Sequence, residues 1–160
     1  MSASAPPPPA VGERIPAMEI GPFDAEALRR YAEVSGDDNP LHLDDALAAS
    51  IGFSAPPVHG MKLLAAFEPM LRAWRADLEL VGLGGTFVQP APRGEKLVLT
   101  GRVLRSTQES VFVRLYAHGS ARAPAIIAEA TLRPSNTAFS SEAEAGSRQE
   151  NASKPFDREV

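Results

Sequence analysis

Apolar residues in the first half of the chain recur at the spacing of helices. Asp24 can cap a helix whose apolar face includes Leu28 and Tyr31 and which ends near Gly36. A second, shorter helix is predicted over 45–51, because a glycine follows it directly. The polar segment between these two helices contains a proline, which favours a loop with a fixed bend. The pattern therefore predicts a polar loop bracketed by two helices.

A longer apolar helix is predicted to begin at Gly60. Its apolar residues lie on more than one side, as expected for a helix enclosed by other structure. These residues are Met61, Leu64, Ala65, Met70, Leu71 and Trp74. Pro69 lies inside the pattern and removes an intrahelical hydrogen bond, so we expect a bend or a division near Phe67.

Beyond this helix the hydrophobic period changes to that of strands. Four segments are rich in Val, Leu, Ile, Phe and Thr and are bounded by Gly, Pro or Ser. They cover 78–90, 96–105, 110–119 and 125–133, and a short extended piece at 18–20 precedes the helices. Successive strands without intervening helices cannot form parallel crossovers. We therefore expect an α+β fold with an antiparallel sheet packed on the long helix, and a bulge near Gly82, Gly84 and Gly85.

The chain has 160 residues, which fits one domain with loose ends. We expect a Pro-rich disordered lead over 1–15, one domain over 16–135, and a disordered polar tail over 136–160. The lead has neither the basic region nor the apolar region of a secretory signal. No apolar stretch approaches the roughly 20 residues that a membrane span needs. These features predict a soluble, cytoplasmic protein without a membrane partner.

Charge and cysteine content exclude several kinds of function. The formal net charge is −4, and the Lys and Arg residues are scattered, which argues against a nucleic-acid partner. The absence of cysteine excludes disulfides, thiolate metal sites and a cysteine nucleophile. The three histidines have no close pairing in the sequence, and no acidic cluster lies at ligand spacing, so we expect no metal site.

The polar loop from Gly36 to His42 carries the residues best suited to chemistry. One reaction that such residues can catalyse is the addition of water to a double bond conjugated with a thioester. This reaction needs one group that takes a proton from water and one that supplies a proton to carbon. Asp37 and His42 can share these roles. The reaction also needs a donor for the thioester oxygen, and the Gly60 amide at the head of the predicted central helix can supply it. Asp37 and His42 each occur more often in ordinary turns or at surfaces, and only their combination with Gly60 favours catalysis.

Three sequence segments resemble the MaoC-like, (R)-specific enoyl-CoA hydratase family. They are Tyr-Ala-Glu-Val-Ser-Gly-Asp-Asp-Asn-Pro-Leu-His over 31–42, Phe-Ser-Ala-Pro-Pro-Val-His-Gly-Met over 53–61, and Phe-Val-Gln-Pro-Ala-Pro-Arg-Gly-Glu-Lys-Leu over 87–97. The resemblance covers roughly 20–134. Where relatives often have Pro-Gly-Asp, this chain has Pro92-Arg93-Gly94-Glu95. We expect the turn to be kept.

The resemblance implies a fold, a site and an assembly. The fold is the hot dog, an antiparallel sheet curled around one long helix. Asp37 and His42 would be the catalytic pair, Asn39 would support them at the substrate, and the Gly60 amide would bind the thioester carbonyl. The substrate would be an acyl-CoA or acyl-carrier thioester, and no cofactor is needed beyond the coenzyme A of the substrate. A homodimer with edge-to-edge sheets is expected.

Two other functions remain open at the level of sequence. A hot-dog acyl thioesterase is possible because the same fold hosts hydrolysis of thioesters. A non-catalytic acyl-thioester-binding subunit is the third possibility. Of the remaining histidines, His59 is interpreted as a structural residue that caps the entrance of the central helix, and His118 as a solvent-facing residue at a strand end.

Overall fold

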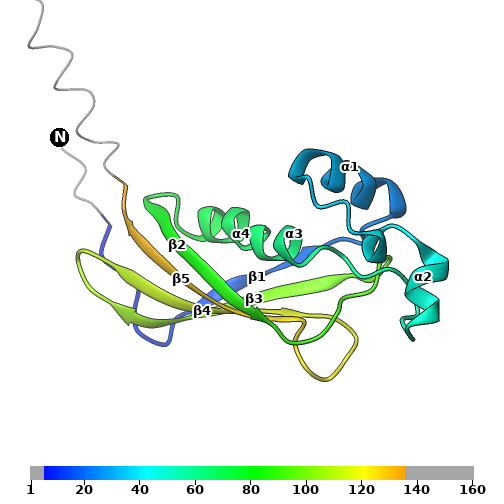
Figure 1. The fold of residues 1–160 in the computed structure, drawn as a ribbon. Coiled ribbons are helices and arrows are strands. Elements are labelled where there is room, and N and C mark those ends of the chain that lie inside the picture. The colour runs from blue at the N-terminus through cyan, green and yellow to red at the C-terminus, as the bar shows by residue number, and fades with distance from the viewer. Residues whose placement is uncertain (1–5, 136–160) are drawn as a thin grey trace, which may run out of the picture.

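The computed structural model describes residues 6–135 as a sheet with helices on one face. The elements follow in the order β1 (Arg14–Ile20), α1 (Ala25–Ser35), the 3₁₀ turn η1 (Pro40–His42), α2 (Asp45–Ser50), α3 (Gly60–Ala65), α4 (Phe67–Trp74), β2 (Leu78–Phe87), β3 (Leu97–Ser106), β4 (Val111–His118) and β5 (Ile126–Pro134). Helices α3 and α4 lie end to end along the sheet, and α1 and α2 lie near one of its ends (Figure 1). The α+β class is therefore as predicted.

The sheet is antiparallel throughout and has the strand order β1-β3-β4-β5-β2. Its register shifts between Leu80 and Gly82 in β2, so the irregularity expected at the glycines is present. Strand β1 is longer than the extended piece predicted at 18–20, and it makes the fifth strand at one edge. A second register shift between Ile15 and Met18 breaks the alternation of buried residues in β1, which hides the strand in the sequence.

An aspartate caps the N-terminus of each helix beside the polar loop, and the cap at Asp24 is the predicted one. The Asp24 carboxylate accepts from the Ala27 N–H at the start of α1, and Gly36 ends this helix with a φ of 76°. The Asp44 carboxylate likewise accepts from the first amides of α2. These caps fix both sides of the polar loop.

The central helix is divided at Ala66 into α3 and α4, close to the expected position. Pro69 lies in the first turn of α4, where a missing N–H is tolerated. Phe67, Met70 and Leu71 are at most 1% exposed and pack against the buried residues of the strands. Burial of one such side chain contributes about 1.5–3 kcal/mol, so this face of α4 holds helix and sheet together.

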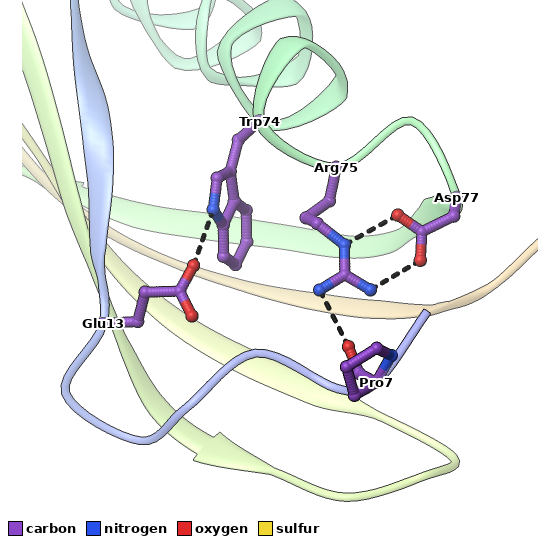
Figure 2. A network of polar contacts seen from close by, with 5 residues as sticks. All are labelled: Pro7, Glu13, Trp74, Arg75 and Asp77. Atoms are coloured by element: carbon purple, nitrogen blue, oxygen red, sulfur yellow. Dashed lines mark hydrogen bonds and ion pairs between the residues drawn. The ribbon is translucent and has the colours of Figure 1, made fainter. Parts of the chain in front are cut away.

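The segment before the predicted domain boundary at residue 16 packs against the rest of the fold. Ile15 is a core residue at 4% exposure, and the segment before it runs beside the end of α4. Figure 2 shows the polar contacts that hold it there: Trp74 Nε1–H donates to Glu13 Oε1 at 3.1 Å, and Arg75 Nη1–H donates to the Pro7 carbonyl at 3.2 Å. Side chains from distant elements thus contact this segment within the predicted lead.

The predicted terminal segments lie partly or wholly outside the described residues. Residues 1–5 and the tail over 136–160 lie outside the described residues. Within 6–135, no helix is long and apolar enough to span a membrane.

Candidate active site

The loop after α1 is shaped by its own short polar side chains. The Ser35 hydroxyl accepts from the Asp37 N–H at 3.2 Å. The Asn39 side-chain oxygen accepts from the Leu41 N–H at 3.0 Å and so caps η1, whose last residue is His42. Proline at the first position of η1 fits this geometry because its missing N–H needs no partner there. The local sequence thus determines the path from Asp37 to His42.

A distant backbone carbonyl fixes the orientation of the His42 ring. His42 Nδ1 lies 2.8 Å from the Pro57 carbonyl oxygen, and since a carbonyl can only accept, Nδ1 carries the proton. The loop that provides this carbonyl is attached to the segment after β2 by the Val58 N–H, which donates to the Ala91 oxygen at 2.8 Å. The neutral ring therefore has its lone pair at Nε2, the form required of a general base.

A cavity of about 450 Å³ lies beside this ring. It is lined by Asp37, Leu41, His42, Phe53, Pro57, Val58, Gly60, Met61, Leu63, 87–91, Ala125 and Ile126. Three of the four predicted site residues, Asp37, His42 and Gly60, thus meet at one cavity. The fourth, Asn39, is not among its lining residues and instead caps η1. The rest of the lining is mostly apolar, which suits an acyl chain.

Gly60 places a free amide and an open backbone at the cavity. No group within 6–135 accepts from its N–H, because the first amides of a helix have no partner in the preceding turn. A Cβ at this position would lie 2.8 Å from Cε1 of Phe87, so the aromatic ring rests directly against the Gly60 backbone. A glycine is needed here for this close approach.

The His59 side chain makes different contacts from those expected of a helix cap. It is the N-cap residue of α3, but its side chain makes no capping hydrogen bond. Its ring is fully buried, stacks on the His42 ring with centroids 4.1 Å apart, and donates from Nε2 to the Asp37 carbonyl at 3.1 Å. The interpretation as a helix cap, and the expectation that the histidines lack a close pairing, are therefore wrong. Neither contact has a signal in the sequence, since each joins residues far apart along the chain.

The same residues form the one group within 6–135 that could be considered for a metal ion. Ligand-type atoms of Asp37, His42 and His59 lie within 4.8 Å of one another. However, the lone pair of a ring nitrogen lies in the plane of its ring, and the two stacked rings are inclined by only 29°. One nitrogen of each ring also donates to a backbone carbonyl, that of Pro57 for His42 and that of Asp37 for His59, so the geometry fits a hydrogen-bonded site better than a metal site.

A larger hollow of about 1050 Å³ lies over the side of the sheet that faces away from the helices. It lies above Gly82 and Gly84, which leave the surface of β2 without side chains. Among the charged groups that line it, Arg114 pairs with Glu129, whose Oε1 lies 2.5 Å from Arg114 Nη2, and the Arg105 guanidinium lies 4.0 Å from the centre of the Phe112 ring. The hollow therefore offers no arrangement for acid–base chemistry, and the smaller cavity is the candidate site.

The turn after β2, where the sequence departs from the family pattern, is kept. The Glu95 N–H donates to the Pro92 oxygen at 3.3 Å, and Gly94 has a φ of 86°. Arg93 pairs with Asp45 of α2 at 2.5 Å. The turn thus connects the sheet to the elements that carry the site.

Comparisons with known proteins find relatives of this chain. The family model described as "MaoC like domain" matches residues 10–119. An (R)-specific enoyl-CoA hydratase of Aeromonas caviae is 47% identical over 49 residues, which are 31% of this chain and 37% of that protein. A mitochondrial 3-hydroxyacyl-[acyl-carrier-protein] dehydratase of Arabidopsis thaliana is 32% identical over 94 residues, 58% of this chain and 57% of that protein. The matches thus span less than two thirds of either relative.

Solved structures show the same fold over most of the chain. The (R)-hydratase from Aeromonas caviae has a TM-score of 0.71 at 27% identity and covers 79% of this chain and 97% of its own. An R-hydratase from Pseudomonas aeruginosa has a TM-score of 0.68 at 26% identity and covers 78% and 81%. The predicted hot-dog fold is confirmed. Because the family model matches more than half of the chain and the fold is shared, the chain belongs to the family of MaoC-like domains.

Proposed function

We propose that the chain is a hydro-lyase that reversibly adds water to a trans-2-enoyl thioester and forms an (R)-3-hydroxyacyl thioester. The observation that carries this proposal is the meeting of three groups at one mostly apolar cavity. These groups are the carboxylate of Asp37, the neutral imidazole of His42 with its proton at Nδ1, and the free amide of Gly60. Hydration of an enoyl thioester requires a base, a proton donor and an oxyanion donor.

In the proposed mechanism, Asp37 and His42 hold one water molecule against the double bond. His42 Nε2 takes a proton as the water oxygen bonds to the β-carbon, and the electron pair of the double bond moves toward the thioester oxygen. The Gly60 N–H donates to this oxygen while it carries negative charge. The acid–base pair then delivers a proton to the α-carbon, which restores the thioester and completes the addition of one water. Asn39 supports the pair through its cap on η1.

We propose coenzyme A as the carrier of the acyl group. The relative with the higher identity, 47% over its short match, is named an enoyl-CoA hydratase. The relative with the longer match is named an acyl-carrier-protein dehydratase, so the carrier is the first variable to test. Activity with coenzyme A thioesters that exceeds activity with acyl-carrier-protein thioesters of the same chain would support this choice.

We also propose that the chain forms a homodimer through β2. This strand lies at an edge of the sheet, and the apolar side chains of Val81 and Phe87 on it are each 50% exposed. Edge strands have unpaired backbone groups that another strand can cover. Residues 87–91 line the cavity, so a partner at this edge would lie close to the substrate. Sedimentation equilibrium should give twice the chain mass, and a monomer at micromolar concentration would contradict the proposal.

A spectrophotometric assay with thiol detection separates the candidate functions. The absorbance of a trans-2-enoyl-CoA should fall without release of free thiol, and chiral analysis of the product should give the (R)-3-hydroxyacyl thioester. Release of thiol would identify a thioesterase instead. Binding of the thioester without either change would identify a non-catalytic acyl-thioester-binding subunit. The survey should cover several chain lengths, because the cavity lining is the part of the site that contacts the acyl group.

A further inference from the structure

His59 is the one polar or charged residue in the part of the chain described, 6–135, that is fully buried. Burial of a titratable side chain costs free energy unless hydrogen bonds compensate for the lost water. The usual role of a residue in its position, capping the helix that follows, is not fulfilled because the side chain makes no capping bond. The buried imidazole therefore requires another explanation.

The contacts of His59 reach both proposed catalytic residues. Its ring face stacks on His42, with centroids 4.1 Å apart and planes inclined by 29°. Its Nε2–H donates to the backbone carbonyl of Asp37 at 3.1 Å. On another side the Tyr31 ring packs against it at 4.8 Å. His59 thus connects the Asp37 backbone and the His42 ring directly to the head of α3.

The hydrogen bond to Asp37 also determines which ring nitrogen of His59 carries the proton. With the proton on Nε2, a second proton would have to bind Nδ1, which is buried and has no partner among residues 6–135. Burial lowers the pKa of His59, and the adjacent His42 lowers it further. Lys62 acts in the same direction, whereas the Asp37 charge and its carbonyl oppose the shift. The ring therefore stays neutral where an exposed histidine is protonated.

We propose that His59 is a positioning residue of the hydratase site, whose neutral ring supports the face of His42 and fixes the Asp37 loop through its Nε2–H. The inference rests on the proposed function. The carboxylate and the imidazole then keep their relative position when His42 takes up a proton, because the support beneath it adds no second positive charge. His59 is not among the cavity-lining residues, so it acts through Asp37 and His42 and not on the substrate.

Two substitutions separate the two contacts. His59→Phe keeps an aromatic face beneath His42 but leaves the Asp37 carbonyl without its donor. His59→Gln can place an amide N–H near the position of Nε2 but removes the ring. His118 provides a matched control, because it also stacks on an aromatic ring, that of Tyr116 at 5.7 Å, but does not line the cavity. The control variant is His118→Gln.

Kinetics and NMR together test the proposal. We expect kcat of His59→Phe to fall about 10-fold to 100-fold with KM within about twofold of wild type, because small displacements of catalytic groups cost about this much. His59→Gln should recover part of the loss, and His118→Gln should match wild type. In ¹⁵N spectra of the imidazoles, His59 should be the neutral Nε2–H tautomer at neutral pH, and its protonation should require a pH below 6.5.

The outcomes distinguish this inference from the function on which it rests. Wild-type kcat in both folded His59 variants, or a rise in KM alone, would overturn the positioning role while the wild-type enzyme remains a hydratase. Titration of His59 near neutral pH, or a proton on Nδ1, would overturn it as well. A wild-type chain without hydratase activity overturns both proposals. If His59→Phe does not fold, His59→Gln and the NMR titration still decide.

Discussion

The two ends of the central helix use their polar groups in opposite ways. At the head of α3, the Gly60 N–H and His59 Nδ1 have no partner among the described residues. At the end of α4, the Trp74 N–H donates to Glu13, and Arg75 makes two hydrogen bonds to Asp77 and a third to the Pro7 carbonyl (Figure 2). Both ends pack against the same core, but only the head of α3 has a backbone amide and a buried ring nitrogen without a partner among the described residues.

This difference distinguishes the candidate active site at the head of α3 from the structural contacts at the end of α4. A buried polar group without a partner costs about 1–3 kcal/mol, so folding alone disfavours the arrangement at the head of α3. Binding a substrate can provide the missing acceptor for the Gly60 N–H, whereas the Trp74 and Arg75 side chains at the end of α4 already have partners. We therefore expect changes at the head to affect catalysis, and changes at the far end to affect stability only.

The largest effect is expected from the acid–base pair. Asp37→Asn and His42→Gln should each lower kcat about 10²-fold to 10⁴-fold, because each removes a group that moves a proton in the transition state. Circular dichroism and thermal unfolding should remain close to wild type, since neither residue belongs to the buried core. The initial rate of enoyl-CoA hydration is the measurement, and near-normal rates in both variants would remove the basis of the proposed site.

A smaller effect is expected from crowding the Gly60 amide. In Gly60→Ala the new Cβ would meet the Phe87 ring at 2.8 Å, so the ring or the helix head must shift. We expect kcat/KM to fall about 10-fold, as for a modest displacement of an oxyanion donor. Phe87→Leu provides space for the methyl group, and the double variant should therefore be more active than Gly60→Ala alone. Strictly additive losses would show that the contact with Phe87 is irrelevant.

The dependence of stability on pH should reveal the buried imidazole of His59. Its pKa in the folded chain lies below the ordinary value of 6.5, with burial as the main cause. The unfolded chain therefore binds this proton first, and the free energy of unfolding falls as pH decreases below 6.5 by up to about 1.4 kcal/mol per pH unit. Urea unfolding between pH 7 and 5 should show a smaller loss in His59→Gln than in wild type. Equal pH slopes would contradict the lowered pKa.

The smallest effect is expected at the far end. The hydrogen bond from Arg75 lowers the pKa of Asp77 below its ordinary value of 3.8. The stabilisation from this pair is therefore present above pH 3.8 and is lost as pH falls through the lower value in the folded chain. Because the pair is partly exposed, Asp77→Asn should cost only about 0.5–1 kcal/mol at neutral pH. Hydratase activity should not change; a loss of activity would show that the two ends are coupled.

Much of the fold is encoded in local patterns. The caps at Asp24 and Asp44, the division of the central helix before Phe67 and the four later strands all follow from residues close together in the chain. Strand β1 does not, because a bulge interrupts its alternation. The contacts of the segment before it could not be predicted for a related reason: a Pro-rich sequence has no periodicity, and its partners Trp74 and Arg75 lie far along the chain.

For the site, the sequence by itself determined the chemical groups and the tertiary structure decided how they are arranged. The loop with Asp37 and His42, and the glycine that opens α3, are recognisable from their spacing alone. The carbonyl of Pro57 that fixes the His42 tautomer, and the His59 ring beneath it, come from a second segment that packs against the loop. Local propensities cannot encode such contacts, because they form only when distant segments share one core and exclude water from it.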